Sequence, residues 1–165
     1  MKNTSIIYRR AHESEYEKII VLQSHIFHTE QGIPEDDTNE ILSRLPICWC
    51  AEQNGEIIGT ALAWREHGIM HWGRFVVIPS MRGQHIGPAL ARFTFEDLFA
   101  HGVDEIHMTA RDTTVKIVCD MGGEITGEPM PFYKGNVTPV VIKRENYFNC
   151  FPSLNALPTF SPMTL

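Results

Sequence analysis

A chain of 165 residues is long enough to bury a sizeable core within a single domain. Its hydrophobic fraction of 43% and charged fraction of 21% are ordinary for a soluble globular protein. The formal net charge of −6 argues against a nucleic-acid partner, because phosphate binding normally needs a basic face. The sequence has no apolar run of signal-peptide or membrane-span length, which predicts a cytoplasmic protein with no membrane partner.

The four cysteines are expected to be reduced thiols in that compartment. Cys48 and Cys50 flank Trp49 in an apolar run, so they would point to the same face of a strand. We interpret them as core residues. A zinc site that combines them with His25 and His28 has suitable atom types but no recognised ligand spacing, and no metal is expected.

The first half of the chain predicts a strand, two helices and an antiparallel meander. Residues 5–11 form the strand, and 14–27 carry apolar residues at helical spacing. Glycine and proline make a loop of 30–37, and a short helix over 38–45 follows. Residues 47–79 indicate three strands, with turns at Asn54-Gly55 and at 65–68.

The second half predicts a turn, a long helix ending at Gly102 and three further strands. The strands span 103–110, 124–133 and 138–144, and a short helix lies over 112–123. Residues 146–165 carry prolines and aromatics without a period, which predicts an irregular tail that packs on a surface groove or is disordered. The sequence thus predicts one α+β domain over 1–145, with a mixed, mostly antiparallel sheet of about six to seven strands flanked by helices.

The stretch RGQHIGPAL, residues 82–90, has the outline of a site for phosphate at the start of a helix. The first amides of a helix lack intrahelical acceptors, and the helix dipole favours an anion beside them. Glycine allows close approach of the backbone, and Arg82 adds charged donors. Taken alone, Gly83 and Gly87 favour a phosphate cradle and a plain strand-to-helix turn about equally.

The wider segment VVIPSMRGQHIGPAL is similar to the acyl-coenzyme A binding segment of the GNAT superfamily of N-acyltransferases. Val77, Pro79, Arg82 and Gly87 match the superfamily pattern, whereas His85 replaces its first glycine. HIFHTEQGIPEDD, followed by GTALAW, resembles the small bacterial acetyltransferases marked by an EQGIP segment. The acyl-homoserine-lactone synthases share a looser version of this pattern.

The resemblance implies a GNAT-like fold with an acyl-CoA in a V-shaped opening between the fourth and fifth strands. The pantetheine arm would pair with the backbone of Phe75, Val76 and Val77. The pyrophosphate would lie on the turn that contains Arg82, Gly83, Gln84, His85, Ile86 and Gly87. Pro88 offers no N–H there, and His85 either supplies a donor or narrows the approach.

Direct acyl transfer to an amine needs a base for the ammonium proton and often an acid for the leaving thiolate. The candidate bases are Glu30, which the EQGIP resemblance singles out, and His71, with Glu66 and His28 behind them. The superfamily's usual tyrosine acid is missing, and Val118 or Cys119 takes its place, so Cys119 is a candidate acid or a structural thiol. Arg74 is expected to bind an anionic acceptor, to pair with Glu30 or to lie on an exposed face.

These observations predict an acyl-CoA-dependent N-acyltransferase that moves an acetyl group from acetyl-CoA to a small-molecule amine. One alternative is a longer acyl donor, carried by CoA or by an acyl carrier protein. Another is a catalytically quiet GNAT-fold module that binds a CoA-like ligand. The sequence leaves a homodimer open.

Overall fold

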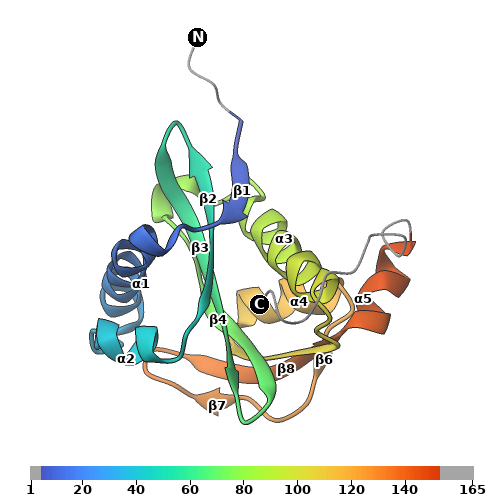
Figure 1. Cartoon of the computed structure of the whole chain (residues 1–165). Helices are drawn as coiled ribbons and strands as arrows, with labels where there is room; N and C mark the ends of the chain where they lie inside the picture. The colour runs from blue at the N-terminus through green and yellow to red at the C-terminus, as the bar shows by residue number, and fades with distance from the viewer. Residues whose placement is uncertain (1–4, 153–165) are drawn as a thin grey trace. The chain divides into compact units, whose positions relative to one another are not determined.

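The computed structural model describes residues 5–152. Figure 1 shows the order of the elements along the chain, which is β1 (Ile7–Arg10), η1 (Glu13–Glu15), α1 (Tyr16–Gln31), α2 (Thr38–Ser43), β2 (Ile47–Gln53), β3 (Glu56–Glu66), β4 (Ile69–Val77), η2 (Pro79–Met81), α3 (Ile86–Ala100), β5 (Glu105–Ala110), α4 (Asp112–Asp120), β6 (Glu124–Ile125), β7 (Met130–Pro131), β8 (Asn136–Lys143) and α5 (Arg144–Cys150).

The strands form one mixed sheet with the order β1-β2-β3-β4-β5-β8-β6, and β7 also pairs with β8. β4 and β5 run parallel and pair at Met70 with Ile106 and at His71 with His107. Antiparallel pairing joins β1 to β2, β2 to β3, and β8 to each of β5, β6 and β7. The predicted α+β class with a mostly antiparallel, helix-flanked sheet is therefore confirmed.

Both predicted turns of the meander are formed by pairs of residues with positive φ. Asn54 and Gly55 have φ values of 54° and 79°, and His67 and Gly68 have values of 52° and 78°. Positive φ at both central residues is the geometry of a two-residue type I′ hairpin turn, which suits the twist of antiparallel strands. These turns fix where β2, β3 and β4 begin and end.

The described chain divides into two compact units. Unit 1 comprises the described residues up to Trp64 together with Arg74–Phe93, and unit 2 comprises Arg65–Gly73 with the described residues from Thr94 onward. β3, β4 and α3 each contribute residues to both units. Each unit has its own set of buried side chains.

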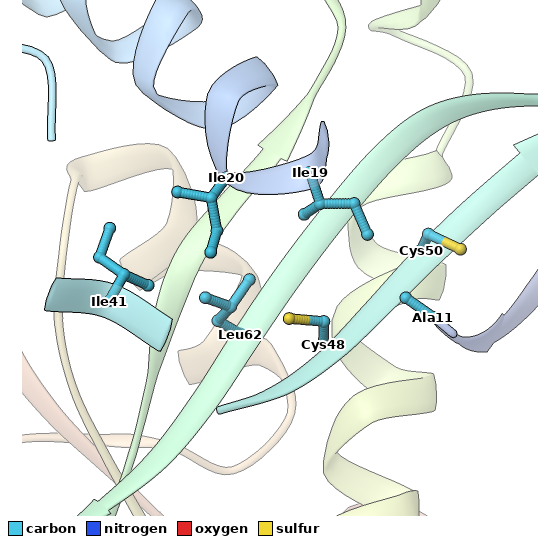
Figure 2. Packing of buried hydrophobic residues seen from close by; sticks show 7 residues of the cluster. All are labelled: Ala11, Ile19, Ile20, Ile41, Cys48, Cys50 and Leu62. Carbon is cyan, nitrogen blue, oxygen red and sulfur yellow. The ribbon is translucent and has the colours of Figure 1, made fainter. Parts of the chain in front are cut away.

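The core of unit 1 brings α1, α2 and β2 together with β3. Figure 2 shows its fully or largely buried members, which are Ala11, Ile19, Ile20, Ile41, Cys48, Cys50 and Leu62. Cys48 and Cys50 lie on one face of β2, as predicted, and burial raises their pKa values to about 12 and about 11. Both are therefore protonated thiols at neutral pH, as expected of buried core residues.

The core of unit 2 is rich in aromatic residues from β4, α3 and α5. The Trp72 indole N–H donates to Thr94 Oγ1 at 2.9 Å, and the Trp72 ring lies 4.9 Å from that of Phe95. The Tyr147 ring packs 5.5 Å from that of Phe99, and its hydroxyl donates to Glu96 at 2.6 Å. Aromatic pairs at such separations stabilise a core beyond the area they bury.

The single strand predicted over 124–133 is wrong, because the structure has two short strands there, β6 and β7. Between them Gly127 packs so closely on Pro139 that a Cβ at Gly127 would lie 2.8 Å from the Pro139 ring. Pro129 follows and has no N–H to donate to a sheet ladder. This interruption explains why the sheet has eight strands.

Two helices also depart from the expected boundaries. α1 continues to Gln31 and ends at Gly32, whose φ of 68° is the left-handed geometry that closes a helix, so Glu30 lies on the helix and not in a loop. Residues 146–150, expected to begin an irregular tail, complete α5 because Tyr147 and Phe148 are buried. The rest of the predicted tail from 153 onward lies outside the described residues, and the proposed domain bounds stay a prediction.

None of the helices within residues 5–152 has the length and apolar character that crossing a bilayer requires.

Candidate functional site

The turn between β4 and α3 leaves several backbone amides without acceptors. β4 ends at Val77, η2 spans Pro79–Met81, and the 15-residue helix α3 starts at Ile86. Within the described part of the chain, the N–H groups of Gly83, Gln84 and His85 donate to no protein acceptor. Unpaired amides at the positive end of a helix dipole form an environment that stabilises an anion.

Gly83 and His85 both give this turn its curvature through left-handed backbone conformations. Gly83 has a φ of 83°, and a Cβ built there would meet nothing within 4 Å, so the space beside it is open. His85 has a φ of 61°, which is the conformation that a glycine adopts at no steric cost. The His85 side chain is exposed, and its carbonyl accepts the first helical bond, from Ala89 at 3.3 Å.

Pro88 lies within the first turn of α3, as predicted. A residue at this position has no intrahelical acceptor for its N–H, so a proline there leaves the helix ladder intact. It also means that the anion-facing end of the helix has one donor fewer.

Arg82 is bound at both ends of its guanidinium. Its Nε donates to the Val77 carbonyl at 3.0 Å, and Nη1 and Nη2 donate to the two Glu30 carboxylate oxygens at 2.7 Å each. The two side chains are 44% and 35% exposed, so this bidentate ion pair is open to solvent. It joins the last turn of α1 to the turn before α3, and it places the Glu30 carboxylate on both terminal nitrogens of Arg82.

The ion pair changes what Glu30 can do chemically. The hydrogen bonds from Arg82 lower the pKa of Glu30, so its carboxylate is a weak proton acceptor at neutral pH. This direction opposes the predicted role of Glu30 as a general base, because an efficient base has a pKa near the working pH. The geometry instead makes Glu30 the counter-ion of Arg82.

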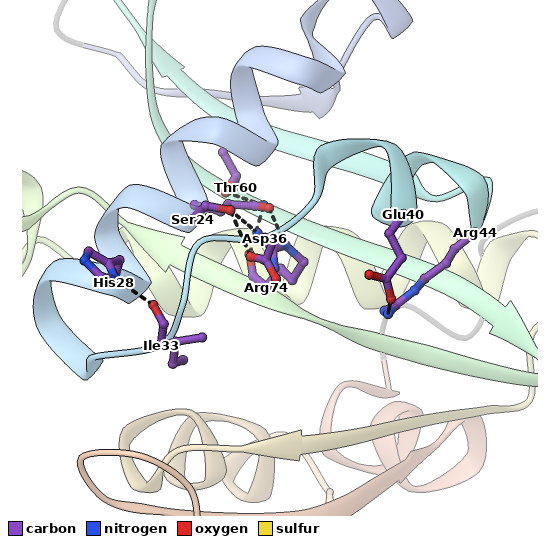
Figure 3. A network of polar contacts seen from close by, with 9 residues as sticks. Ser24, His28, Ile33, Asp36, Glu40, Arg44, Thr60 and Arg74 are labelled. Atoms are coloured by element: carbon purple, nitrogen blue, oxygen red, sulfur yellow. Dashed lines mark hydrogen bonds and ion pairs between the residues drawn. The ribbon is translucent and has the colours of Figure 1, made fainter.

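Arg74 lies at the centre of a polar network, drawn in Figure 3. Its Nε donates to Gln23 at 2.8 Å, Nη1 to Asp36 at 2.7 Å and Nη2 to Ser24 at 3.2 Å. Gln23 in turn donates to the Thr60 hydroxyl and to the Arg74 carbonyl. The network ties α1 and the loop before α2 to β3 and β4 in unit 1.

The expected pairing of Arg74 with Glu30 is wrong, since Arg74 pairs with Asp36. The Arg74 side chain is 14% exposed, and burial is the main influence that lowers its pKa. Its φ of 49° marks an irregularity in β4 that turns the Arg74 carbonyl toward Gln23. Arg74 thus holds the strand and the loop in place, and its predicted contact with an acceptor stays a prediction.

His71 lies on β4 in unit 2, beside His107 of the parallel strand β5. The two rings are 6.4 Å apart, and His107 Nε2 lies 3.2 Å from a Glu105 oxygen. Burial, assisted by the positive charge that His107 can carry, lowers the pKa of His71, while Glu66 opposes the shift. His71 is therefore a neutral imidazole at physiological pH, the form that accepts a proton.

Cys119 and Val118 differ in how accessible their side chains are on α4. Val118 is fully buried, whereas Cys119 is partly exposed. Burial raises the pKa of Cys119, so it is a thiol at neutral pH. Of the two residues, Cys119 is the one that carries a proton and reaches solvent.

The two remaining candidate bases, His28 and Glu66, lie at the ends of α1 and β3. His28 contacts the Ile33 carbonyl at 2.9 Å through Nδ1 and helps to close α1 (Figure 3). Glu66 ends β3 and is exposed. Within residues 5–152, no group of three or more His, Cys, Asp or Glu side chains is arranged to hold a metal ion.

Comparison with protein families identifies the fold. The profile described as "Acetyltransferase (GNAT) family" matches residues 9–117. The chain belongs to the GNAT acetyltransferase family. It is therefore an acyltransferase, and its general activity is acyl-CoA-dependent transfer to an amine.

Solved structures of several other proteins have the same fold. Escherichia coli ElaA superposes with a TM-score of 0.74 at 18% identity, covering 84% of this chain and 100% of that chain. A putative N-acetyltransferase from Lactobacillus plantarum gives 0.70 at 17% identity, with coverage of 85% and 97%. YncA, a putative acetyltransferase from Salmonella typhimurium solved with its cofactor acetyl-CoA, gives 0.67 at 17%, with coverage of 85% and 94%. Comparison with curated sequences gives no match.

The sequence did not single out four members of the Arg74 network, namely Gln23, Ser24, Asp36 and Thr60. Gln23 shares the buried face of α1 with Ile19 and Ile20, so an amide at an apolar helical position was the available signal. Asp36 is the middle one of three acids after Pro34, where nothing in the sequence distinguishes the partner of a buried arginine from a solvated acid.

Proposed function

We propose that the chain transfers an acetyl group from acetyl-CoA to the amine of a small molecule by direct transfer. The observation that carries the proposal is the turn before α3, where amides without acceptors meet the start of a long helix beside an open glycine. The acetyl-CoA bound by YncA supports the choice of donor. The negative net charge and four free cysteines favour a cytoplasmic enzyme without a nucleic-acid partner.

The donor would lie along unit 1 from β4 to α3. The amides of Gly83, Gln84 and His85 would bind the pyrophosphate together with Arg82, and Ile86 and Gly87 complete the first turn. The backbone of Phe75, Val76 and Val77 would bind the pantetheine arm. The Val77 carbonyl already accepts a hydrogen bond from Arg82, but a carbonyl has two lone pairs and can accept a second.

His71 would be the general base, because it is neutral at the working pH. It would accept a proton from the acceptor ammonium, which frees the nitrogen lone pair to form the new C–N bond at the thioester carbonyl. Acetyl-CoA supplies the activated acyl group as a thioester.

Cys119 would be the proton donor. Its raised pKa keeps the thiol protonated, and its intrinsic acidity is close to that of the departing CoA thiol. It would give its proton to the sulfur as the C–S bond breaks, and the second proton released from the acylated nitrogen would restore the Cys119 thiol. Cys119 would thus take the place of the tyrosine that the resemblance leads one to expect.

Calorimetric titration with CoA, acetyl-CoA and octanoyl-CoA tests the donor site. We expect micromolar-range binding of acetyl-CoA and about tenfold or greater weakening in Arg82→Ala, since a charge-assisted hydrogen bond to phosphate contributes about 1.5–3 kcal/mol. Arg44→Ala is the matched control, because Arg44 is an exposed arginine paired with an exposed glutamate, as Arg82 is. Absence of binding to all three ligands would overturn the proposal.

Turnover is tested by incubating the chain with acetyl-CoA and a panel of primary amines and measuring free CoA and acetylated product by chromatography. We expect acetyl transfer to at least one small amine. Preferential binding and turnover of octanoyl-CoA would show that the donor carries a longer chain. Tight binding of acetyl-CoA with no transfer to any amine of the panel would favour a module that only binds CoA.

A further inference from the structure

Glu30 and Arg82 form an ion pair whose atoms stand at the proposed donor site. Both Glu30 oxygens accept hydrogen bonds of 2.7 Å from the two terminal nitrogens of Arg82. This is the bidentate geometry with which an arginine also binds two oxygens of a phosphate. The carboxylate therefore uses the same donors of Arg82 that a diphosphate would use.

The pair is positioned for exchange of its partner. Arg82 and Glu30 are 44% and 35% exposed, and an ion pair in contact with solvent contributes little to stability, so it costs little to separate. The Arg82 Nε remains bonded to the Val77 carbonyl, and this bond involves neither terminal nitrogen. Arg82 can thus release Glu30 and stay at the turn.

Charge favours the same exchange. Glu30 neutralises Arg82, which is the only arginine or lysine within residues 82–88. A diphosphate arriving at the amides of 83–85 meets the carboxylate as a like charge, and it gains Arg82 only when Glu30 moves away. The carboxylate therefore opposes binding of the donor and favours departure of CoA after transfer.

We propose that Glu30 is an internal competitor of the CoA pyrophosphate for Arg82, and so a residue that sets donor affinity and product release rather than a base. This inference rests on the proposed donor site. Glu30 acts through Arg82, and its removal strengthens binding of CoA, which loss of a base or of a structural contact would not do.

The experiment measures the dissociation constant and dissociation rate of CoA by calorimetry and stopped-flow fluorescence, in the wild-type chain and in Glu30→Gln. We expect Glu30→Gln to bind CoA about two- to fivefold more tightly, the range that an exposed ion pair is worth, mainly through slower dissociation. Glu40→Gln is the matched control, because it removes one charge from another exposed glutamate paired with an arginine. It should leave CoA affinity unchanged.

A double-variant comparison separates competition from general repulsion. In the Arg82→Ala background, Glu30→Gln should change CoA affinity by much less than in the wild-type chain. An equal gain in both backgrounds would overturn the inference, as would unchanged or weaker binding by Glu30→Gln alone. If the wild-type chain binds no CoA, the proposed function fails and the inference fails with it. Wild-type binding without a gain refutes the inference alone.

Discussion

At the scale of single residues, His85 adopts the left-handed backbone conformation that glycine adopts most easily, at the position where the superfamily pattern has a glycine. Its φ of 61° places a side chain in the left-handed region, where a Cβ crowds the following carbonyl. The histidine is exposed, so nothing packed around it accounts for the choice of residue. The turn therefore keeps the curvature of a glycine-rich site at some cost in backbone energy.

Replacing His85 with glycine and with alanine separates the contribution of the imidazole from that of the left-handed backbone. Both variants remove the imidazole, but only His85→Gly relieves the backbone, and glycine's greater flexibility in the unfolded chain offsets part of the gain. We expect His85→Gly to be more stable than His85→Ala by about 0.5–1 kcal/mol in urea unfolding. Equal stability of the two variants would show that the left-handed backbone is not strained.

His71 makes a prediction about pH. Burial lowers its pKa from the ordinary value of 6.5, so the neutral form persists to lower pH than in a free histidine. The kcat/KM profile should therefore be flat through neutral pH and fall only below 6.5, as the imidazole takes up a proton. His71→Gln should remove this acid limb and lower kcat/KM by roughly 10²–10⁴-fold, the usual contribution of a general base.

His25→Gln is the control for this measurement, because His25 lies on the exposed face of α1.

The lowered pKa of His71 also affects the stability of the fold. Between the lowered pKa and 6.5 the unfolded chain binds more protons at residue 71 than the folded chain does, so stability should decrease as pH falls through this window. A kcat/KM that is independent of pH below 6.5 would exclude His71 as the base.

At the scale of elements, the Arg74 network fastens the loop before α2 to β4. Asp36 is the charged partner of a largely buried guanidinium, and loss of one partner leaves the other charge uncompensated. We expect Asp36→Asn to lower the free energy of unfolding by about 1–3 kcal/mol, less than for a fully buried pair because Asp36 remains partly exposed.

Urea unfolding of Asp36→Asn alongside Glu40→Gln measures this effect. Glu40 pairs with Arg44 at 3.5 Å on the exposed face of α2, so its neutralisation should change stability by less than about 0.5 kcal/mol. Similar losses in the two variants would mean that the network contributes no more than a surface ion pair.

The elements that could be predicted from sequence are those with a local cause. Asn54-Gly55 specifies its hairpin turn by itself, and the apolar spacing of α1 specifies the helix. α5 could not be predicted, because seven residues form a helix there through the burial of Tyr147 and Phe148. Packing against distant segments decides such a helix, and a short sequence window does not contain that information.

The same distinction holds within the candidate site. The turn at 82–87 was predictable because glycines, an arginine and the start of a helix follow one another along the chain. The charged partners of Arg82 and of Arg74 could not be predicted. Glu30 meets Arg82 across 52 residues, and Asp36 meets Arg74 across 38, so only the fold selects these pairs.

At the scale of the whole molecule, β3, β4 and α3 each run through both compact units. Hydrogen-bonded elements of this kind tend to form or break as a whole, so the two units are expected to unfold together. Asp36→Asn in unit 1 and Tyr147→Phe in unit 2, which removes the bond to Glu96, should each lower the midpoint of one shared transition.

Circular dichroism and tryptophan fluorescence test this expectation. Trp49 and Trp64 report on unit 1, and Trp72 reports on unit 2. The circular-dichroism signal and the tryptophan fluorescence should give coincident melting curves in the wild-type chain and in both variants. A variant that shifts one signal and leaves the other in place would show that the units unfold separately.

The two core thiols of β2 can report on local opening of the core of unit 1. Cys48 and Cys50 are fully buried and protonated, so an alkylating reagent cannot react with them while β2 is covered by α1. Cys150 is exposed and reacts without any opening. The delay between modification of Cys150 and modification of the β2 thiols therefore measures how often the core of unit 1 opens. Mass spectrometry under native conditions can follow both reactions.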